Sequence, residues 1–358
     1  MKQALLTELS FFLNLKAKAS SKTPTISSIY FGGGTPSLAE VSTIGDVIAH
    51  LKNNYPLTPN IEITLEANPT SIEMSKLKDF KSVGVNRISL GVQALNDGDL
   101  VFLGRRHSLA QAIDTIHLSK SLFGRVSFDL LYGRSSAHQP HQWREELKHA
   151  LSLDTGHLSL YNLTVEPGTP LNEKVRKGKV VMPDEDLQTE LYEATVEVME
   201  EHGYKQYEIS NFALPGFESK HNINYWKGGD YIGVGPGAAG RITVMENGLF
   251  IKRSFLQERH PPRWMDTVLR EGVATQEDTT LTTKQQLTEL IMSGLRTDEG
   301  IHFTENFGVL SNGLQLDEIF DVGYINKYKQ FLHFSPEGLK ATSQGRLILD
   351  TILSEILL

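Results

Sequence analysis

The sequence predicts an α/β fold built on a parallel sheet, because short β-branched or aromatic runs alternate with helical patterns over residues 25–165. Helix boundary residues separate the runs: Thr70 precedes a helix that Gly84 ends, and Ser108 precedes a helix that Gly124 ends. Polar residues gather where each run ends, which is the edge at which such sheets build their sites. The predicted strands are Ile26–Phe31, Ile61–Glu66, Arg87–Gly91, Val126–Leu131 and His157–Leu163.

The rest of the chain divides into further regions. Leucines and phenylalanines in the first 22 residues are spaced for an amphipathic helix, although the lysines and serines there also resemble an organelle transit peptide. A long helix that Pro183 and Asp184 open is expected to run to Glu201, followed by strands and loops over residues 204–255 and a linker-like break at Pro261. The predicted domains are 1–22 (N-terminal helix), 23–182 (partial βα barrel), 183–260 (barrel extension) and 261–358 (small, mostly helical C-terminal domain).

The C-terminal region should contain three helices and a short strand pair around Leu339. The helical patterns cover Thr283–Leu295, Ile325–Phe334 and Gly345–Leu357. This organisation resembles a winged helix, but the region has no basic face for nucleic acid.

Composition excludes several classes of function. A net charge of −8 provides no basic stripe for phosphates, so nucleic acid is not expected as a partner. No apolar run reaches the roughly 18 residues of a transmembrane helix. There is no cysteine, which excludes disulfides, thiolate zinc sites, a cysteine nucleophile and cysteine-held iron–sulfur clusters in this chain.

Two glycine-rich segments invite a ligand interpretation. Residues 32–36 (Gly-Gly-Gly-Thr-Pro) follow a strand and either bring backbone amides close to a ligand or form a simple tight turn. Residues 235–240 match G-x-G-x-x-G, but a strand and turn pattern follows instead of the helix that dinucleotide binding requires. We therefore interpret the second segment as a loop in which backbone atoms are crowded.

Polar side chains at successive strand ends predict a ring around one ligand. Glu66, Gln93, Arg105 and Asp129 could supply carboxylates for an amine and for hydroxyls, and a guanidinium for a carboxylate. The alternative is a set of unrelated polar residues at strand ends.

The segment His221-Asn222-Ile223-Asn224-Tyr225-Trp226 predicts a second site. Histidine and tyrosine both serve as axial ligands of haem iron, and tryptophan offers a flat apolar face to a porphyrin. The alternative is a structural histidine that is hydrogen-bonded within a loop.

Ordered motifs from residue 25 to about residue 245 together resemble the HemN/HemW group of radical S-adenosylmethionine proteins, which are coproporphyrinogen III oxidase-like. The C-terminal region is similar to the C-terminal domain of that group. His221–Trp226 resembles the haem-chaperone branch. The motifs are Tyr30–Ser37, Leu65–Pro69, Asn86–Gln93, Leu103–His107, His157–Tyr161, Glu166–Thr169, Tyr207–Ala213 and His221–Trp226.

The resemblance implies a radical-SAM partial barrel and two ligands. Haem would bind His221, Asn222, Tyr225 and Trp226, with His221 as the candidate iron ligand; no residue is predicted to be catalytic. Haem-acceptor proteins, respiratory ones among them, are the expected partners. Localisation is mitochondrial by resemblance to animal relatives, with the cytoplasm as the alternative. The residues that match S-adenosylmethionine positions are Gly33, Thr35, Glu66, Gln93, Arg105 and Asp129.

The chain also departs from the family pattern. The family places Cys-x-x-x-Cys-x-x-Cys after the first barrel strand, and neither that strand nor any cysteine is found here, so this chain cannot hold the family's 4Fe-4S cluster. Ala239 replaces a common histidine, and residues 133–135 read Gly-Arg-Ser instead of Gly-Leu-Pro. We therefore expect a haem chaperone without radical catalysis.

Two alternatives stay open. One is a radical-SAM oxidoreductase that resembles oxygen-independent coproporphyrinogen III oxidase, which requires a longer product with the cysteine motif. The other is an isoform or incomplete gene model that aggregates, because a barrel without its first strand exposes backbone edges.

Overall fold

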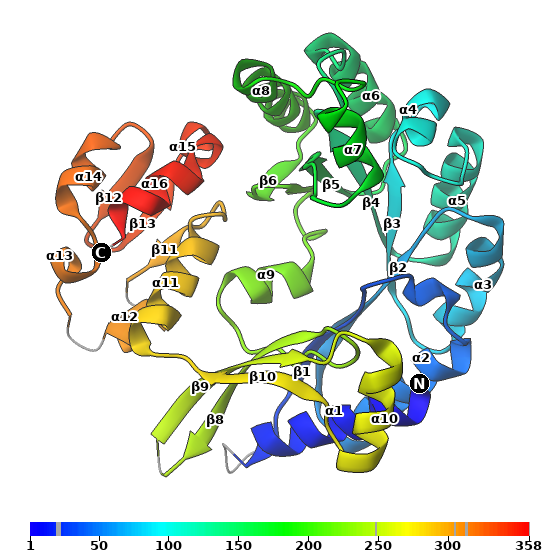
Figure 1. Ribbon diagram of the computed structural model, residues 1–358, viewed down its shortest axis with the longest axis vertical. Helices are drawn as coiled ribbons and strands as arrows, with labels where there is room; N and C mark the ends of the chain where they lie inside the picture. Colours follow the sequence, from blue (N-terminus) through cyan, green and yellow to red (C-terminus); the bar gives the residue numbers. More distant parts are fainter. Residues whose placement is uncertain (19–22, 248, 304–305, 312–313, 358) are drawn as a thin grey trace. The chain divides into compact units, whose positions relative to one another are not determined.

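The computed structural model describes the chain except for residues 19–22, 248, 304–305, 312–313 and 358 (Figure 1). The described residues divide into two compact units. The sheet unit comprises Tyr30–Val41 and Glu62–Ser219, and the terminal unit comprises Met1–Ile29, Ser42–Ile61 and Lys220–Leu358.

The main sheet has seven strands in the order β1-β2-β3-β4-β5-β7-β6. Strands β2 to β5 pair in parallel, whereas β7 pairs antiparallel with both β5 and β6. All five predicted strands are present, and the sheet has two edges, β1 and β6, within the described residues, so the predicted partial barrel is confirmed. The strands are β1 (Ile26–Phe31), β2 (Leu57–Ala67), β3 (Arg87–Gln93), β4 (Arg125–Tyr132), β5 (His157–Asn162), β6 (Lys205–Glu208) and β7 (Asn211–Ala213).

Local capping explains the helices of this region. The side chains of Thr70, Ser108 and Asp184 each accept a hydrogen bond from the first turn of the helix that follows, as the sequence predicts. Helices α3 and α5 contact each other outside the strands, and so do α6 and α8 (Figure 1). The helices are α2 (Val41–Asn54), α3 (Ser71–Ser82), α4 (Asp97–Phe102), α5 (Leu109–Leu122), α6 (Pro140–Ser152), α7 (Pro170–Arg176) and α8 (Glu185–Glu201), with a 3-10 turn at Pro36–Leu38.

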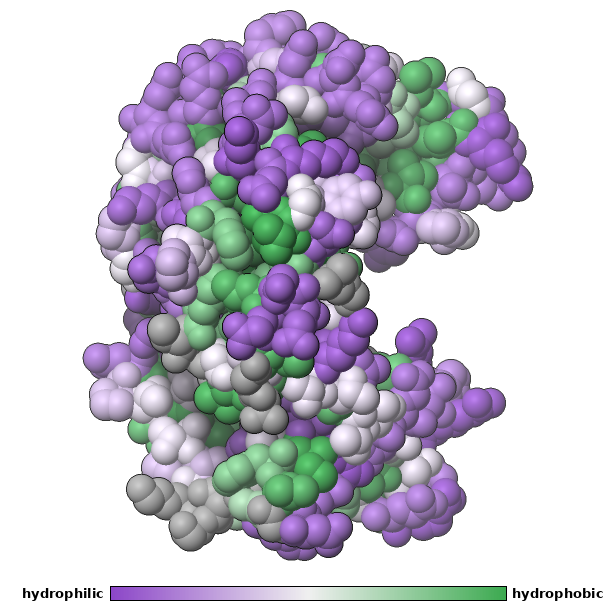
Figure 2. Space-filling view, turned by 90° about the vertical axis from the view of Figure 1, so that its left-hand side faces the viewer, coloured by the Kyte–Doolittle hydropathy of each residue, from purple (hydrophilic) through white to green (hydrophobic). Residues whose placement is uncertain are grey.

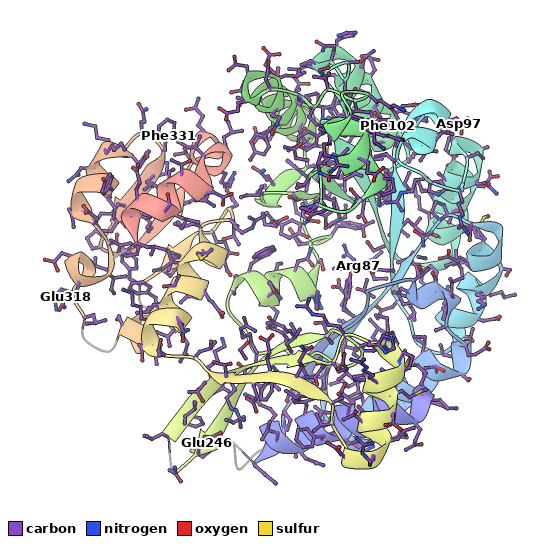
Figure 3. All side chains as sticks on the ribbon, viewed as in Figure 1. Arg87, Asp97, Phe102, Glu246, Glu318 and Phe331 are labelled. Atoms are coloured by element: carbon purple, nitrogen blue, oxygen red, sulfur yellow. The ribbon has the colours of Figure 1, made fainter. Side chains whose placement is uncertain are left out.

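The apolar core of the sheet unit lies on one face of the central strands. Leu90, Phe128 and Leu158 are register partners on β3, β4 and β5, so they share that face, and all three are fully buried. Arg87, at the start of β3, is buried too and pairs with Glu62 at 3.2 Å (Figure 3). This ion pair satisfies two charges that would be costly if buried alone.

The terminal unit contains two small sheets, in the orders β10-β9-β8 and β11-β13-β12. Phe12 of the first helix packs with Phe255 and Ile242 of the first of these sheets. The elements are α1 (Lys2–Ala17), α9 (Lys220–Trp226), β8 (Ala239–Glu246), β9 (Leu249–Gln257), α10 (Pro261–Glu271), β10 (Thr275–Thr280), α11 (Thr283–Gly294), β11 (Ile301–His302), α12 (Asn306–Ser311), α13 (Leu316–Ile319), α14 (Val322–Lys327), β12 (Leu332–Ser335), β13 (Gly338–Ala341), α15 (Ser343–Leu347) and α16 (Leu349–Ile356).

Three local predictions in this unit are wrong. Residues 220–226 form helix α9 and not a loop. Pro261 begins α10 and is not part of a linker, because proline has the backbone angle of a first helical turn. The predicted helix Ile325–Phe334 ends at Lys327, and its second half forms strand β12. The helix at Thr283 and the strand pair at Leu339 are confirmed, whereas the predicted helix Gly345–Leu357 is divided into two helices, α15 and α16.

No helix among the described residues is both long and apolar enough to cross a bilayer. The surface seen in Figure 2 is mostly hydrophilic, with smaller apolar patches.

Candidate ligand-binding sites

The predicted polar ring forms, in large part, at the carboxyl edge of the parallel strands. Thr35, Glu66, Gln93 and Asp129 line one small cavity of about 180 Å³ in the sheet unit. Gly33 is beside it, because its backbone N–H donates to Glu66 at 3.1 Å. Parallel strands end at one edge of a sheet, which is why residues from β1 to β4 meet here.

Arg105 is the exception in this predicted set. It follows α4 and is not among the residues that line the cavity. Its charge nevertheless opposes the rise in the pKa of Asp129, and burial lowers the pKa of Arg105 itself. The Nε atom of Arg105 is buried and has no hydrogen-bond partner among the described residues.

Glu66 holds the glycine-rich loop through hydrogen bonds to its carboxylate. Its carboxylate accepts one hydrogen bond from the hydroxyl of Tyr30 at 2.6 Å and the other from Gly33. Gly33 and Gly34 have φ angles of 77° and 64°, a conformation that favours glycine. The predicted tight turn is therefore present, and the backbone N–H of Gly33 is held by a carboxylate of the cavity.

Two residues of this edge are in unfavourable states: Asp129 has a raised pKa, and Gln93 has a strained backbone conformation. Burial, reinforced by the charge of Glu66, raises the pKa of Asp129 to about 7, against a hydrogen bond with Ser159 and the charge of Arg105. Gln93 has a φ of 79°, which is strained for a residue with a Cβ, and it lies at an irregularity in the pairing of β3 with β4. Strain of this kind is common where a side chain must face a ligand.

The second predicted set lies on α9, in the terminal unit. His221 and Tyr225 are one helical turn apart and so share a face of the helix. The centroid of the Tyr225 ring lies 4.8 Å from that of Tyr231 and 5.4 Å from that of Trp226, and the Tyr225–Trp226 pair is T-shaped. The guanidinium of Arg296 lies 4.9 Å above the Trp226 ring, as in a cation–π contact. His221 and Asn222 also each have an interaction partner within the chain.

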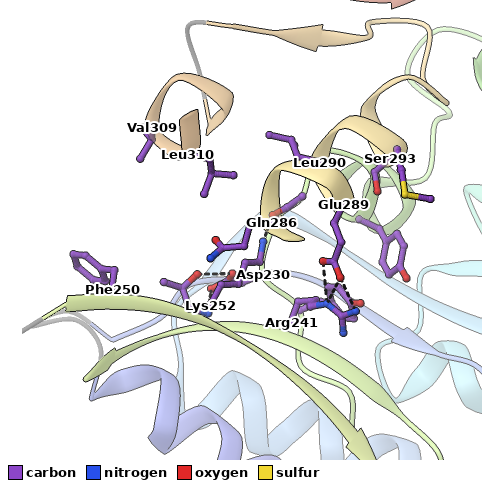
Figure 4. A pocket seen from close by; sticks show the side chains of 16 residues that line it. Asp230, Arg241, Phe250, Lys252, Gln286, Glu289, Leu290, Ser293, Val309 and Leu310 are labelled. Carbon is purple, nitrogen blue, oxygen red and sulfur yellow. Dashed lines mark hydrogen bonds and ion pairs between the residues drawn. The ribbon is translucent and has the colours of Figure 1, made fainter. Parts of the chain in front are cut away.

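A larger cavity adjoins this helix, and sequence reasoning missed it. It measures about 610 Å³, and Tyr225 lines it together with Tyr231, Arg241 and Lys252 from the strand region (Figure 4). The last two residues lie on β8 and β9, where alternating polar and apolar residues gave no signal beyond an ordinary hairpin.

The second glycine-rich segment is not followed by the helix of a dinucleotide-binding fingerprint. Residues 235–240 lead into strand β8, as predicted, and no helix follows them. A Cβ atom on Gly240 would lie 3.2 Å from the backbone nitrogen of Gly233, and one on Gly233 would lie 2.0 Å from the oxygen of Ala239. The predicted crowding of backbone atoms is confirmed.

Comparisons with known proteins show the family to which the chain belongs. The sequence pattern of the Radical SAM superfamily matches residues 14–135. "Radical S-adenosyl methionine domain-containing protein 1, mitochondrial" of Dictyostelium discoideum is 41% identical over 97% of this chain and 84% of its own length. "Heme chaperone HemW" of Bacillus subtilis is 34% identical over 95% of this chain and 87% of its own length. The chain belongs to the HemW-like family of radical SAM proteins.

A solved structure supports the fold of this family member. Coproporphyrinogen III oxidase (HemN) of Escherichia coli, described as a radical SAM enzyme, matches 98% of the chain and 81% of its own with a TM-score of 0.77. The sequence identity is 19%, so the likeness shows the fold alone.

The cofactors that the family implies do not fit this chain equally well. A 4Fe-4S cluster does not fit, because the 358 residues contain no cysteine, and no group of three histidine, aspartate or glutamate residues is placed to hold a metal within the described part of the chain. S-adenosylmethionine fits the donors at the sheet edge better, since Glu66 and Asp129 offer carboxylates and Gln93 an amide.

Proposed function

We propose that this chain is a haem-binding protein that delivers haem to acceptor proteins, and that its own residues do not perform radical chemistry. The observation that carries the proposal is α9, which presents His221, Tyr225 and Trp226 within two turns beside a cavity large enough for a ligand. The name of the Bacillus subtilis relative, a haem chaperone, supports the same function.

The residues of α9 suit a transient haem cargo. An imidazole or a phenolate can bind haem iron, and His221 is our candidate for this ligand. Tyr225 is 40% exposed, so its ring can contact a ligand that arrives from solvent. Trp226 is held by Arg296 and offers an apolar surface at the end of the helix. A short, partly exposed helix with a candidate iron ligand is suited to release as well as to capture.

Hemin titration tests the proposal. We expect the purified chain to give a saturable shift of the Soret band, and the variant His221→Ala with Tyr225→Phe to lose at least tenfold in affinity, because both candidate iron ligands are removed. The variant His117→Ala, which changes an exposed histidine on α5, should bind as the unchanged chain does. Absence of a shift in the unchanged chain, or equal shifts in all three proteins, would contradict haem binding through α9.

The partners and location follow from the same proposal. Acceptors of haem would be haem proteins, with respiratory proteins among them. Relatives from Danio rerio and Bos taurus carry the word mitochondrial in their names, which supports mitochondria as the place of delivery, with the cytoplasm as the alternative. The likeness to HemN gives no support for a coproporphyrinogen substrate, because it concerns the fold alone.

We also propose that the sheet edge binds S-adenosylmethionine through Gly33, Thr35, Glu66, Gln93 and Asp129, with Arg105 nearby. Equilibrium dialysis against labelled S-adenosylmethionine tests this second site. Gln93→Ala should weaken binding about tenfold, because one polar contact is lost in a small, partly buried cavity. The variant Gln142→Ala, on α6 and outside that cavity, is the control. Equal binding by both variants would count against the site.

A further inference from the structure

The cavity beside Tyr225 is built from both sheet and helix. Its walls come from β8, β9, α9, α11 and α12, all within the terminal unit. Its volume of about 610 Å³ lies inside the range of roughly 300–1,000 Å³ that is usual for small-molecule sites. Its residues on β8 and β9 lie outside both glycine-rich segments and outside His221–Trp226.

Apolar side chains on one side of this cavity are unusually exposed. Phe250 is 70% exposed and Val309 is 78% exposed, and Leu310 lies beside Val309 (Figure 4). Large apolar groups that gather at a cavity mouth mark a surface that a ligand or partner covers. The apolar side is suited to the flat hydrocarbon body of a ligand.

The charged side of the cavity is largely neutralised in pairs. Arg241 donates from Nε and from one terminal nitrogen to the carboxylate of Glu289, at 2.9 to 3.2 Å (Figure 4). The carboxylate of Asp230 is bound by the ammonium of Lys16 and by the backbone N–H and hydroxyl of Thr243. Both acidic groups of the lining therefore already have partners.

Lys252 differs from these paired groups. Among the described residues, its ammonium donates to a neutral acceptor, the carbonyl oxygen of Gly228, at 2.7 Å. An ammonium has three protons to donate, so it can still bind an anion. Burial lowers the pKa of Lys252, although the charges of Asp230 and Glu289 oppose this. A carboxylate that entered the cavity would compensate the burial of this cation.

We propose that this cavity is the seat of the haem and that Lys252 binds one of its propionate carboxylates while the apolar side covers the macrocycle. The inference rests on the proposed haem function and extends it to residues outside the α9 motif. Tyr225 connects the two, because it belongs to α9 and also lines the cavity. Haem combines an apolar plate with two carboxylates, which is the division of surfaces that the cavity offers.

The contact between Lys252 and a propionate is tested by changing the protein and the ligand separately and together. Hemin and hemin dimethyl ester, which has no free carboxylate, are titrated into the unchanged chain, Lys252→Met and Lys284→Met, with Soret spectroscopy. Lys284 is exposed on α11 and does not line the cavity. We expect Lys252→Met to bind hemin about tenfold more weakly and to bind the ester as the unchanged chain does, because the ester has already lost the contact. Lys284→Met should match the unchanged chain with both ligands.

The outcomes separate this inference from the function on which it rests. If the unchanged chain binds no hemin, the haem function fails and the cavity assignment fails with it. If the unchanged chain binds hemin and Lys252→Met binds it equally well, the assignment alone is overturned. Should Lys252→Met not fold, the unchanged chain decides the matter: about tenfold weaker binding of the ester supports a carboxylate contact, and equal binding overturns it.

Discussion

Replacing Glu8 by alanine is expected to lower the free energy of unfolding by roughly 3 kcal/mol. Glu8 of α1 is fully buried, and its carboxylate accepts hydrogen bonds from the backbone N–H groups of Gly235 and Ala274 and from the indole of Trp264, at 2.9 to 3.2 Å. Alanine would leave three buried donors without an acceptor, each costing roughly 1–3 kcal/mol. Burial raises the pKa of Glu8, so the charge of its carboxylate is itself costly to bury. Removing that charge offsets part of the stability lost with the hydrogen bonds.

Urea denaturation, followed by tryptophan fluorescence and by circular dichroism, measures the effect of Glu8→Ala. Lys2→Met is the matched control on the same helix, because Lys2 forms an exposed ion pair with Asp46 and should change stability by less than about 1 kcal/mol. Glu8→Gln keeps one acceptor oxygen and should lie between the two. A loss below about 1 kcal/mol for Glu8→Ala would show that the three donors find other partners.

Features that depend on residues close together in the sequence were predictable from it. The strands and the caps at Thr70, Ser108 and Asp184 follow from patterns within about 15 residues, and the structure contains all of them. Helix α9 escaped prediction because its seven residues are too few to show a helical period before Gly228 ends the pattern.

The residues of the two sites were predictable from the sequence to different degrees. The sheet-edge residues were predictable because parallel strands bring their ends together, whatever lies between them. The position of Arg105 was not, since it follows a short helix whose direction no local pattern sets. The buried role of Glu8 depends on Trp264, which lies 256 residues away, and the role of Lys252 depends on α11 and α12 covering a hairpin.

The variant Asp129→Asn is expected to remove a pH dependence of stability. The pKa of Asp129 rises from 3.8 to about 7 on folding, so the native state holds its proton where the unfolded chain has lost it. This contribution is complete below about pH 4, falls as the pH rises, and is gone above about pH 7. At roughly 1.4 kcal/mol per pKa unit, the unchanged chain should lose about 2–3 kcal/mol relative to Asp129→Asn between pH 5 and pH 8.

Urea denaturation of both proteins across this pH range gives the difference directly, because other titrating groups affect both alike. Asp114→Asn, which changes an exposed carboxylate on α5, should track the unchanged chain at every pH. A constant difference between Asp129→Asn and the unchanged chain would mean that the carboxylate is better solvated than its surroundings indicate. A difference that grows with pH would show that the folded chain keeps a desolvated carboxylate at the sheet edge, whose pKa a bound cationic group would lower again.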